Sequence, residues 1–236
     1  LSEYVPAWKV ASYTSSHHPF LRELADTDKP IIMSTGAHEL SEVRESVDVL
    51  ESAGVSGLAL LQCVAAYPTP LEEINVRVVE TLVDEFGVPA GLSDHTLDPT
   101  AAPVAAVALG ASVVEKHFTL DKSMEGPDHQ FALEPDQLSE MVAAIRDTET
   151  ALGTAKKSIL EVESELHDKA RRAVHAVEDV AAGEEFTAEN VKVLRPGERE
   201  AGLPPKFYDK ILGKVAACDV PQNSGLQWDD VENYGS

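Results

Sequence analysis

The stretch "PAGLSDHTLDPTAAPVAAVALGASVVEKHF" (residues 89–118) contains a strand, a helix and a second strand in succession. Its two end runs, residues 89–95 and 112–118, start apolar and finish in polar or charged residues. Between them, Asp98 is placed to cap a helix with Pro99 in its first turn. Strands that alternate with helices in this way predict a parallel α/β sheet.

The same alternation extends through the first half of the chain. Further short apolar runs occupy residues 7–12, 30–36 and 58–63. Helical patterns occupy residues 38–54, 74–87 and 134–153, and the first of these places Leu40, Val43, Val47 and Leu50 on one face. The first half is therefore predicted to contain five strand–helix units.

Polar residues gather at the C-terminal ends of the five runs. They are Lys9 and Ser12, Ser34 and Thr35, Gln62, Ser93 to His95, and Glu115 to His117. A (β/α)₈ TIM barrel builds its active site at that end of its strands. No glycine-rich phosphate loop supports a nucleotide-binding open sheet instead. We therefore predict a TIM barrel of which this chain carries about five βα units. Because the chain does not begin with Met, we expect about three further strands to precede it.

The second half has a different composition. Residues 154–170 are polar and charged, which is typical of a linker, and residues 171–236 hold short β-like runs separated by turns. Within them "DVAAGEEFTAENV" (residues 179–191) aligns with "DVPQNSGLQWDDV" (residues 219–231). The predicted organisation is a partial barrel domain over residues 1–153, a linker over 154–170 and a small pseudo-symmetric β domain over 171–236.

Charge and composition exclude several classes of protein. The 236 residues carry a formal net charge of -22, from 19 basic and 41 acidic side chains. This balance disfavours nucleic-acid or anionic-membrane partners, and no run approaches the roughly 20 apolar residues of a membrane span. Two cysteines far apart, Cys63 and Cys218, give no disulfide framework. We expect a cytoplasmic protein, and a halophilic one, since a dispersed acidic surface fits a high-salt cytoplasm.

Alternation along the strands brings two histidines together. Glu115 and His117 point the same way, opposite to Lys116, and Ser93 and His95 share a face. If the two strands are neighbours about 4.8 Å apart, His95 and His117 converge and can hold one divalent metal. Glu115 then binds a substrate hydroxyl or orients a metal ligand. The alternative is that each histidine only forms hydrogen bonds within a polar barrel end.

Other residues at the predicted mouth suit an anionic substrate. Lys9, Ser12 and Ser34 offer an ammonium group and hydroxyls for a phosphate or carboxylate, although a strand-end lysine and an ordinary Ser-Thr turn explain them equally well. Tyr67 lies in a proline-stiffened loop as a packing residue or a ligand contact. Asp128 lies in a Gly-Pro turn, "EGPDH", that either faces the mouth or is only a turn.

Several stretches together resemble the sialic acid synthase family, which comprises N-acetylneuraminate synthase and its relatives. They are "WKVAS", "KPIIMSTG", "GLSDHTLD", "AAVALGASVVEKHFTLD" and "GPDHQFALEPDQL". "VKVLRPGE" and "LGKVAAC" resemble the antifreeze-like (SAF) domain of the same enzymes. The likeness covers nearly the whole chain.

The resemblance implies a transferase in which a TIM barrel condenses phosphoenolpyruvate with an N-acetylated amino sugar such as N-acetylmannosamine. The product is a nine-carbon 2-keto acid, and phosphate is released. It implies His95, His117 and Glu115 as catalytic residues, with His95 and His117 binding Mn²⁺, Mg²⁺ or Co²⁺. It implies that Lys9, Ser12, Ser34 and Ser93 hold phosphoenolpyruvate and that Tyr67, Glu115 and Asp128 contact the sugar. Arg195 would enter the site of the partner subunit, which implies a domain-swapped homodimer.

Three positions depart from the family pattern. Thr14 stands where relatives usually carry an acidic residue, Ala65 where some carry a sugar-contacting Asn, and Gln62 where others carry His. The resemblance therefore leaves open a pseudaminic or legionaminic acid synthase. It also leaves open a truncated, non-catalytic sugar-binding or assembly subunit. A phosphoenolpyruvate synthase acting on a phosphorylated sugar is disfavoured by the SAF-like domain.

Overall fold

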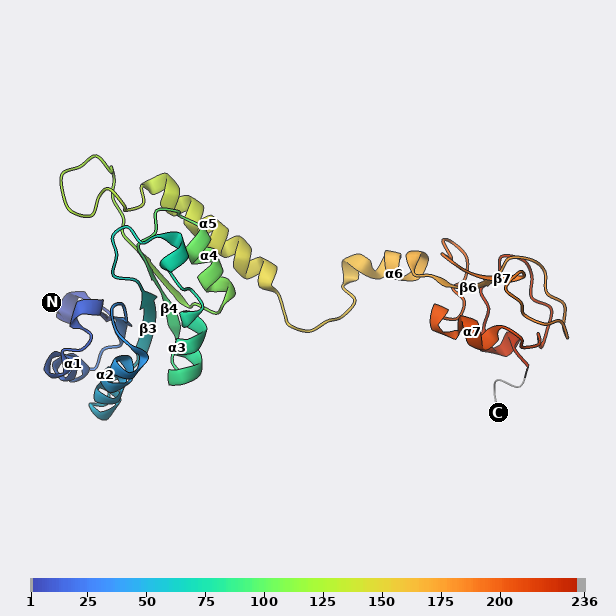
Figure 1. Ribbon diagram of the computed structural model, residues 1–236, viewed down its shortest axis with the longest axis horizontal. Coiled ribbons are helices and arrows are strands. Elements are labelled where there is room, and N and C mark those ends of the chain that lie inside the picture. Colours follow the sequence, from blue (N-terminus) through green and yellow to red (C-terminus); the bar gives the residue numbers. More distant parts are fainter. Residues whose placement is uncertain (1, 233–236) are drawn as a thin grey trace. The chain divides into compact units, whose positions relative to one another are not determined.

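The computed structural model describes residues 2–232 and consists of two compact units (Figure 1). Unit 1 spans Leu1–Thr154 and unit 2 spans Ala155–Ser236. Each unit has its own hydrophobic core. Over the described part of the chain, every helix is too short or too polar to cross a membrane.

Unit 1 is built on one parallel sheet of five strands. They are β1 (Trp8–Val10), β2 (Ile31–Ser34), β3 (Leu58–Cys63), β4 (Ala90–Asp94) and β5 (Val113–Lys116), paired in sequence order. The sheet curls into a half-barrel, so unit 1 belongs to the α/β class with a TIM-barrel-like arrangement. Every predicted strand is present, and each starts within one residue of its predicted position and ends at most two residues early.

Helices follow the strands and cover one face of the sheet (Figure 1). They are α1 (His18–Ala25), α2 (Leu40–Ser52), α3 (Val78–Phe86), α4 (Ala101–Ala108) and α5 (Pro135–Leu152). Leu21, Leu50 and Leu82 from three of these helices are almost fully buried in the core against the sheet. Their burial supplies the main stabilising term of the unit, because each large apolar side chain contributes about 2 kcal/mol.

Two helices start later than the sequence predicts. The segment before α3 forms a separate short 3₁₀ turn, Leu71–Glu73, and Asn75 takes a positive φ of 49°, which delays the helix to Val78. The N-cap residue of α4 is Thr100 rather than the expected Asp98, and Pro99 precedes the helix rather than lying in its first turn. Asp98 nevertheless binds the start of the helix through its side chain. Its Oδ1 accepts hydrogen bonds from the backbone N–H groups of Thr100 and Ala101, at 2.8 and 2.7 Å.

Unit 2 is a small, mostly irregular β structure. Its antiparallel strands β6 (Ala173–Ala176) and β7 (Val191–Leu194) pair with each other, and two short helices accompany them, α6 (Ser164–Ala170) and α7 (Tyr208–Ile211). α6 lies inside the range that composition favours as a linker, because its residues are polar yet good helix formers. The core of the unit gathers around Phe186, Ile211 and Leu226.

The internal repeat of unit 2 is confirmed by matched hydrogen bonds. Val180 and Val220 form a reciprocal antiparallel bridge, with N···O distances of 2.9 Å and 2.8 Å. Asp219 accepts from the N–H of Ala182 at 2.8 Å, and its counterpart Asp179 accepts from that of Gln222 at 2.7 Å. Each half therefore completes the backbone hydrogen bonding of the other.

Candidate active site

A cavity of about 320 Å³ lies at the C-terminal ends of the strands of unit 1. Nine of the ten predicted site residues line it: Lys9, Ser12, Ser34, Tyr67, Ser93, His95, Glu115, His117 and Asp128. They come from all five strands or from the segments that directly follow them. The structure thus brings these side chains together in one hollow, as expected for a barrel mouth.

Lys9 forms a cationic corner of this cavity. Its Nζ donates to Ser34 Oγ at 2.8 Å and to the Val10 carbonyl oxygen at 3.0 Å, and it lies 3.5 Å from Glu115 Oε1. The ammonium group is therefore held in place before any substrate arrives. About a third of the Lys9 side chain is exposed (34%), so an incoming anion can reach it.

The ends of β1 and β2 are joined beside this corner through Gly36. Its backbone N–H donates to Ser12 Oγ at 3.0 Å. A Cβ atom at position 36 would lie 2.9 Å from Ser12 Oγ and 3.0 Å from the Cys63 carbonyl oxygen. Only glycine fits this close approach without displacing its neighbours, which is why the "STG" turn carries one.

Ser93 and Glu115 are direct neighbours on β4 and β5, as strand alternation predicts. Ser93 Oγ donates to Glu115 Oε1 at 2.6 Å, and the same carboxylate oxygen faces Lys9. Two donors, the Lys9 ammonium group and the Ser93 hydroxyl, thus hold the Glu115 carboxylate through the same oxygen. Its side chain stays 40% exposed toward the cavity.

His95 and His117 directly follow β4 and β5, and their ring centroids are 5.2 Å apart. His95 Nδ1 lies 3.0 Å from the Val64 carbonyl oxygen, so Nδ1 carries the proton and Nε2 keeps its lone pair. Burial lowers the pKa of His95, and nearby His117 acts in the same direction, while the hydrogen bond to Val64 opposes them. The neutral, ligating form of the ring is therefore favoured.

An aromatic cluster surrounds His117. The rings of Tyr67 and Phe131 lie 6.1 and 5.0 Å from the His117 ring, and Tyr67 also packs on His95 at 4.2 Å. Burial, followed by the nearby Cys63 thiol, raises the pKa of Tyr67 to about 12, so the phenol stays protonated. Asp128 reaches the cavity from its loop, with Oδ2 3.7 Å from His117 Nδ1.

The two imidazoles fit a shared metal ion by geometry and donor type. Two rings bound to one metal at about 2.1 Å have centroids about 5 Å apart, close to the separation seen here. Within residues 2–232, no three His, Cys, Asp or Glu side chains are grouped to hold one ion. Substrate and water would therefore complete the coordination.

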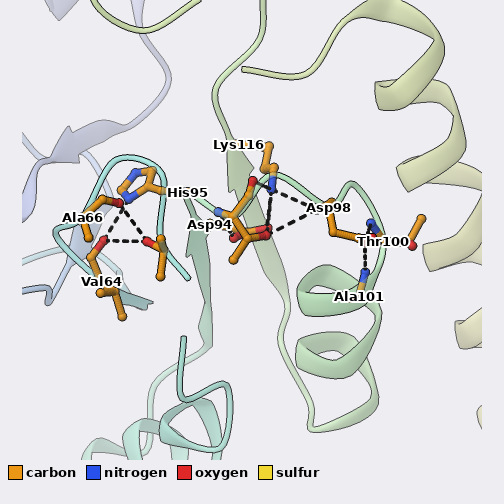
Figure 2. Close-up of polar contacts among 10 residues, drawn as sticks. Val64, Ala66, Asp94, His95, Asp98, Thr100, Ala101 and Lys116 are labelled. Carbon is orange, nitrogen blue, oxygen red and sulfur yellow. Dashed lines mark hydrogen bonds and ion pairs between the residues drawn. The ribbon is translucent and has the colours of Figure 1, made fainter. Parts of the chain in front are cut away.

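A buried ion pair lies on the reverse face of the same two strands. Lys116 Nζ is 2.5 Å from Asp94 Oδ2, and these side chains are only 3% and 0% exposed. Figure 2 shows the pair on the side of α4, with His95 beside the backbone of Val64 and Ala66. Side chains alternate between the two faces of a sheet, and Asp94 and Lys116 directly precede His95 and His117. They therefore point to the face opposite to the histidines.

Two residues at the end of β3 correct the sequence analysis. Gln62, expected among the polar groups of the mouth, points away, and its Nε2 donates to the Ile74 carbonyl oxygen at 3.0 Å. Cys63 lines the cavity instead, with Sγ 4.0 Å from His95 Nδ1. The register Cys63↔Ser93 puts Cys63 in the row of Ser93 and Glu115, and this register is visible only in the structure.

Three other residues from the sequence analysis lie outside the cavity lining. Arg195 follows β7 in unit 2 and is exposed. Thr14 ends a short 3₁₀ turn (Ser12–Thr14) after β1, and Ala65 follows β3. Both are partly buried. Phe131, by contrast, was missed, because a lone apolar residue in a loop carries no periodic signal.

Comparison with known proteins identifies both units. A model described as the NeuB family matches residues 1–157, and a SAF domain model matches residues 171–232. The spore coat polysaccharide biosynthesis protein SpsE of Bacillus subtilis is 40% identical over 95% of this chain, and its crystal structure superposes with a TM-score of 0.60.

Two further relatives carry names that specify a product. A pseudaminic acid synthase of Campylobacter jejuni is 40% identical over 95% of the chain. The structure of an N-acetylneuraminic acid synthetase from Leptospira borgpetersenii is 30% identical over 69% of the chain and 56% of its own, with a TM-score of 0.64. The chain spans 64% of the length of each of the two curated relatives, SpsE and the pseudaminic acid synthase.

Proposed function

This chain belongs to the NeuB family and carries a SAF domain, and from that premise we propose that it functions in a sialic acid synthase-type enzyme. The reaction joins phosphoenolpyruvate to an N-acetylated amino sugar and releases phosphate. The synthases among its relatives support an enzyme of this kind. The observation that supports this proposal most directly is one cavity that combines the cationic corner at Lys9 with the paired imidazoles of His95 and His117.

The anionic substrate is held at the Lys9 corner. The Nζ of Lys9 and the hydroxyls of Ser12, Ser34 and Ser93 offer one positive charge and three donors for phosphate and carboxylate oxygens. Ser34 and Ser93 already engage Lys9 and Glu115, so phosphoenolpyruvate exchanges these contacts for its own. This pre-arranged corner lowers the cost of ordering the site on binding.

The sugar lies beside this corner, between Glu115 and the side chains of Tyr67 and Asp128. Tyr67 remains protonated and can donate its phenol O–H, while Glu115 and Asp128 accept from sugar hydroxyls. A divalent cation such as Mn²⁺, Mg²⁺ or Co²⁺, when bound by His95 and His117, supplies Lewis acidity to a carbonyl oxygen. The hydrogen bond from His95 Nδ1 to Val64 orients the ring for this role.

The bond changes balance without any further reactant except water. C3 of phosphoenolpyruvate attacks the aldehyde carbon of the open-chain sugar, which forms one C–C bond and leaves a cationic centre at C2. Water adds to C2, and the resulting tetrahedral carbon loses phosphate as its C–O bond breaks. The aldehyde oxygen ends as a hydroxyl and C2 as a ketone, giving the 2-keto acid. The residues of the cavity position both substrates in line for the first step.

Arg195 and the assembly state form a separate part of the proposal. Arg195 is one of several exposed cations of unit 2, and it directly follows β7. We place it in the site of a partner subunit within a domain-swapped homodimer. The acidic composition fits a cytoplasmic, salt-adapted enzyme.

A second candidate function is a non-catalytic sugar-binding or assembly subunit. Thr14 and Ala65 stand at positions where the family resemblance implies an acidic residue and, in some members, an Asn. They favour this alternative or a different acceptor sugar, such as that of a pseudaminic or legionaminic acid synthase. The cationic corner at Lys9 and the paired rings of His95 and His117 favour catalysis.

Incubation of the protein from its complete gene tests these alternatives. Phosphoenolpyruvate and Mn²⁺ are combined with N-acetylmannosamine or with 2,4-diacetamido-6-deoxy hexoses, and phosphate and 2-keto acid are measured. Equal amounts of both products with one sugar are expected. Release of neither product with any sugar would contradict catalysis, and sugar binding without turnover would favour the assembly subunit.

A further inference from the structure

The buried ion pair behind the cavity lies next to both histidines in the chain. Asp94 is the last residue of β4 and directly precedes His95, and Lys116 is the last residue of β5 and directly precedes His117. Asp94 and Lys116 are register partners across the two strands. Their contact is therefore a cross-link at the level where the two imidazoles leave the sheet.

The Lys116 ammonium group is surrounded by oxygen atoms. Besides Asp94 Oδ2 at 2.5 Å, it contacts the Thr96 carbonyl oxygen at 2.6 Å. Thr96 Oγ1 and the Asp98 carbonyl oxygen both lie at 3.3 Å. Three N–H donors thus meet four acceptors, and the ammonium group ties the end of β5 to the chain segment that leads from β4 into α4.

The Asp94 carboxylate is equally well satisfied. Its Oδ1 accepts from the Thr96 N–H at 2.8 Å, and its Oδ2 accepts from Thr96 Oγ1 at 3.1 Å as well as from Lys116. A buried network in which every member is paired has one well-defined geometry, because any displacement leaves a charge without a partner. The backbone on either side of His95 is consequently fixed.

We propose that Asp94 and Lys116 are positioning residues that set the spacing between the His95 and His117 rings. The pair acts through the backbone, since it lies on the face of the sheet opposite to the cavity (Figure 2). Its importance for catalysis rests on the function proposed above, but its effect on ring spacing does not.

On the cavity side, His95 is oriented by its hydrogen bond to Val64 of another segment, which does not tie β4 to β5. Across the two strands the cavity side offers the Ser93–Glu115 hydrogen bond, one residue pair deeper than the Asp94–Lys116 level. The Tyr67 and Phe131 rings pack against His117 without directional bonds. The ion pair is therefore the side-chain contact between β4 and β5 that lies nearest to the two histidines.

The test uses two variants and one control in the protein from its complete gene. Lys116→Met removes the ammonium group, and the double variant Asp94→Asn/Lys116→Met removes both charges, so that no uncompensated carboxylate stays buried. Val47→Ala is the control, since it opens a cavity in α2 of the same unit without touching β4 or β5. Crystal structures give the ring separation, and free Mn²⁺ measured by electron paramagnetic resonance gives the affinity.

In the double variant, the ring centroids should separate by about 1 Å from the native 5.2 Å, and Mn²⁺ should bind at least about tenfold more weakly. Val47→Ala should lower the melting temperature by a comparable amount but should leave the ring separation and the Mn²⁺ affinity unchanged. An unchanged ring separation in the double variant would overturn the proposal, whatever the Mn²⁺ affinity. If the native protein binds no Mn²⁺, the metal part of the proposed function fails, and the ring separation still decides the positioning role.

Discussion

The two units each bury a histidine, in different surroundings. His95 in unit 1 is 5% exposed, hydrogen-bonds to Val64 and opens onto a cavity. His175 on β6 of unit 2 is 0% exposed, and neither ring nitrogen has a hydrogen-bond partner of normal geometry among the described residues. Burial lowers the pKa of both rings, so both are expected to be neutral near pH 7.

The two histidines differ in whether a hydrogen bond orients the buried ring. Around His95 the polar atoms are paired on both faces of the sheet, which fixes the ring while leaving Nε2 available. His175 instead fills space in unit 2 at the cost of unpaired nitrogens. Both rings are buried, so hydrogen bonding rather than burial distinguishes His95 from His175.

The largest effect is expected when the buried pair of unit 1 is broken. Lys116→Met should destabilise unit 1 by about 3–5 kcal/mol, because the Asp94 carboxylate is left buried without a countercharge. The chain has two tryptophans, Trp8 in unit 1 and Trp228 in unit 2. Urea unfolding of a Trp228→Phe background, followed by Trp8 fluorescence, therefore reports on unit 1. A loss below about 1 kcal/mol would mean that the pair is solvated in solution.

A second prediction concerns the histidine pair itself. His117→Ala should lower metal-dependent kcat by about 100- to 1000-fold, since it removes one imidazole of the proposed metal site. The measurement is phosphate release at saturating phosphoenolpyruvate and sugar. His175→Leu is the matched control and should retain near-native kcat. Equal turnover of His117→Ala and the native protein would remove His117 from the mechanism.

The buried His175 predicts that the stability of unit 2 depends on pH. Burial lowers the pKa of His175, the Arg199 guanidinium lowers it further, and the backbone of Asn223 and Ser224 opposes them only in part. Because the folded pKa lies below the unfolded value of about 6.5, the unfolded state binds more protons in acid. The stability of unit 2 should be full above pH 6.5 and fall below it, with a limiting slope of about 1.4 kcal/mol per pH unit.

Trp228 fluorescence in a Trp8→Phe background measures this slope for unit 2 alone. His175→Leu should flatten it, since leucine fills similar space without a titrating group. A slope that persists in His175→Leu would assign the acid sensitivity to another group.

The smallest effect is expected at the start of α4. Asp98→Ala removes the carboxylate that accepts from the Thr100 and Ala101 N–H groups and should cost about 1 kcal/mol in unit 1. The Asp98 carbonyl oxygen, which contacts Lys116, is retained. Unit 1 should therefore weaken while the His95–His117 spacing stays native, unlike in the Lys116 variants. A change in Mn²⁺ affinity would show that the cap also positions the site.

The part of the site that the sequence could predict follows from the alternation of side chains along each strand. Apolar runs with polar ends gave all five strands, and the period of two put Glu115 with His117 and Ser93 with His95. The same rule set Lys116 on the reverse face, but it could not name Asp94 as the partner of Lys116. The direction of a side chain follows from local geometry, whereas its partner depends on register between strands.

The remaining differences come from contacts that sequence spacing does not encode. Gln62 was expected at the mouth, but it satisfies the Ile74 carbonyl group, and Cys63 takes the place at the cavity. Phe131 packs on His117 from a loop, where no periodicity marks it. The segment around α6 looked like a linker, because a short polar helix has no apolar stripe to distinguish it.

The repeat in unit 2 has a consequence for how that unit reaches its fold. Val180 and Val220 hydrogen-bond across 40 residues of chain, and the paired aspartates Asp179 and Asp219 accept across 43 and 37 residues. Neither half can complete its own hydrogen bonds first, so loop-closure entropy is lost before stabilising contacts form. Unit 2 should therefore fold in a single cooperative and comparatively slow step, with a half-formed repeat too unstable to accumulate.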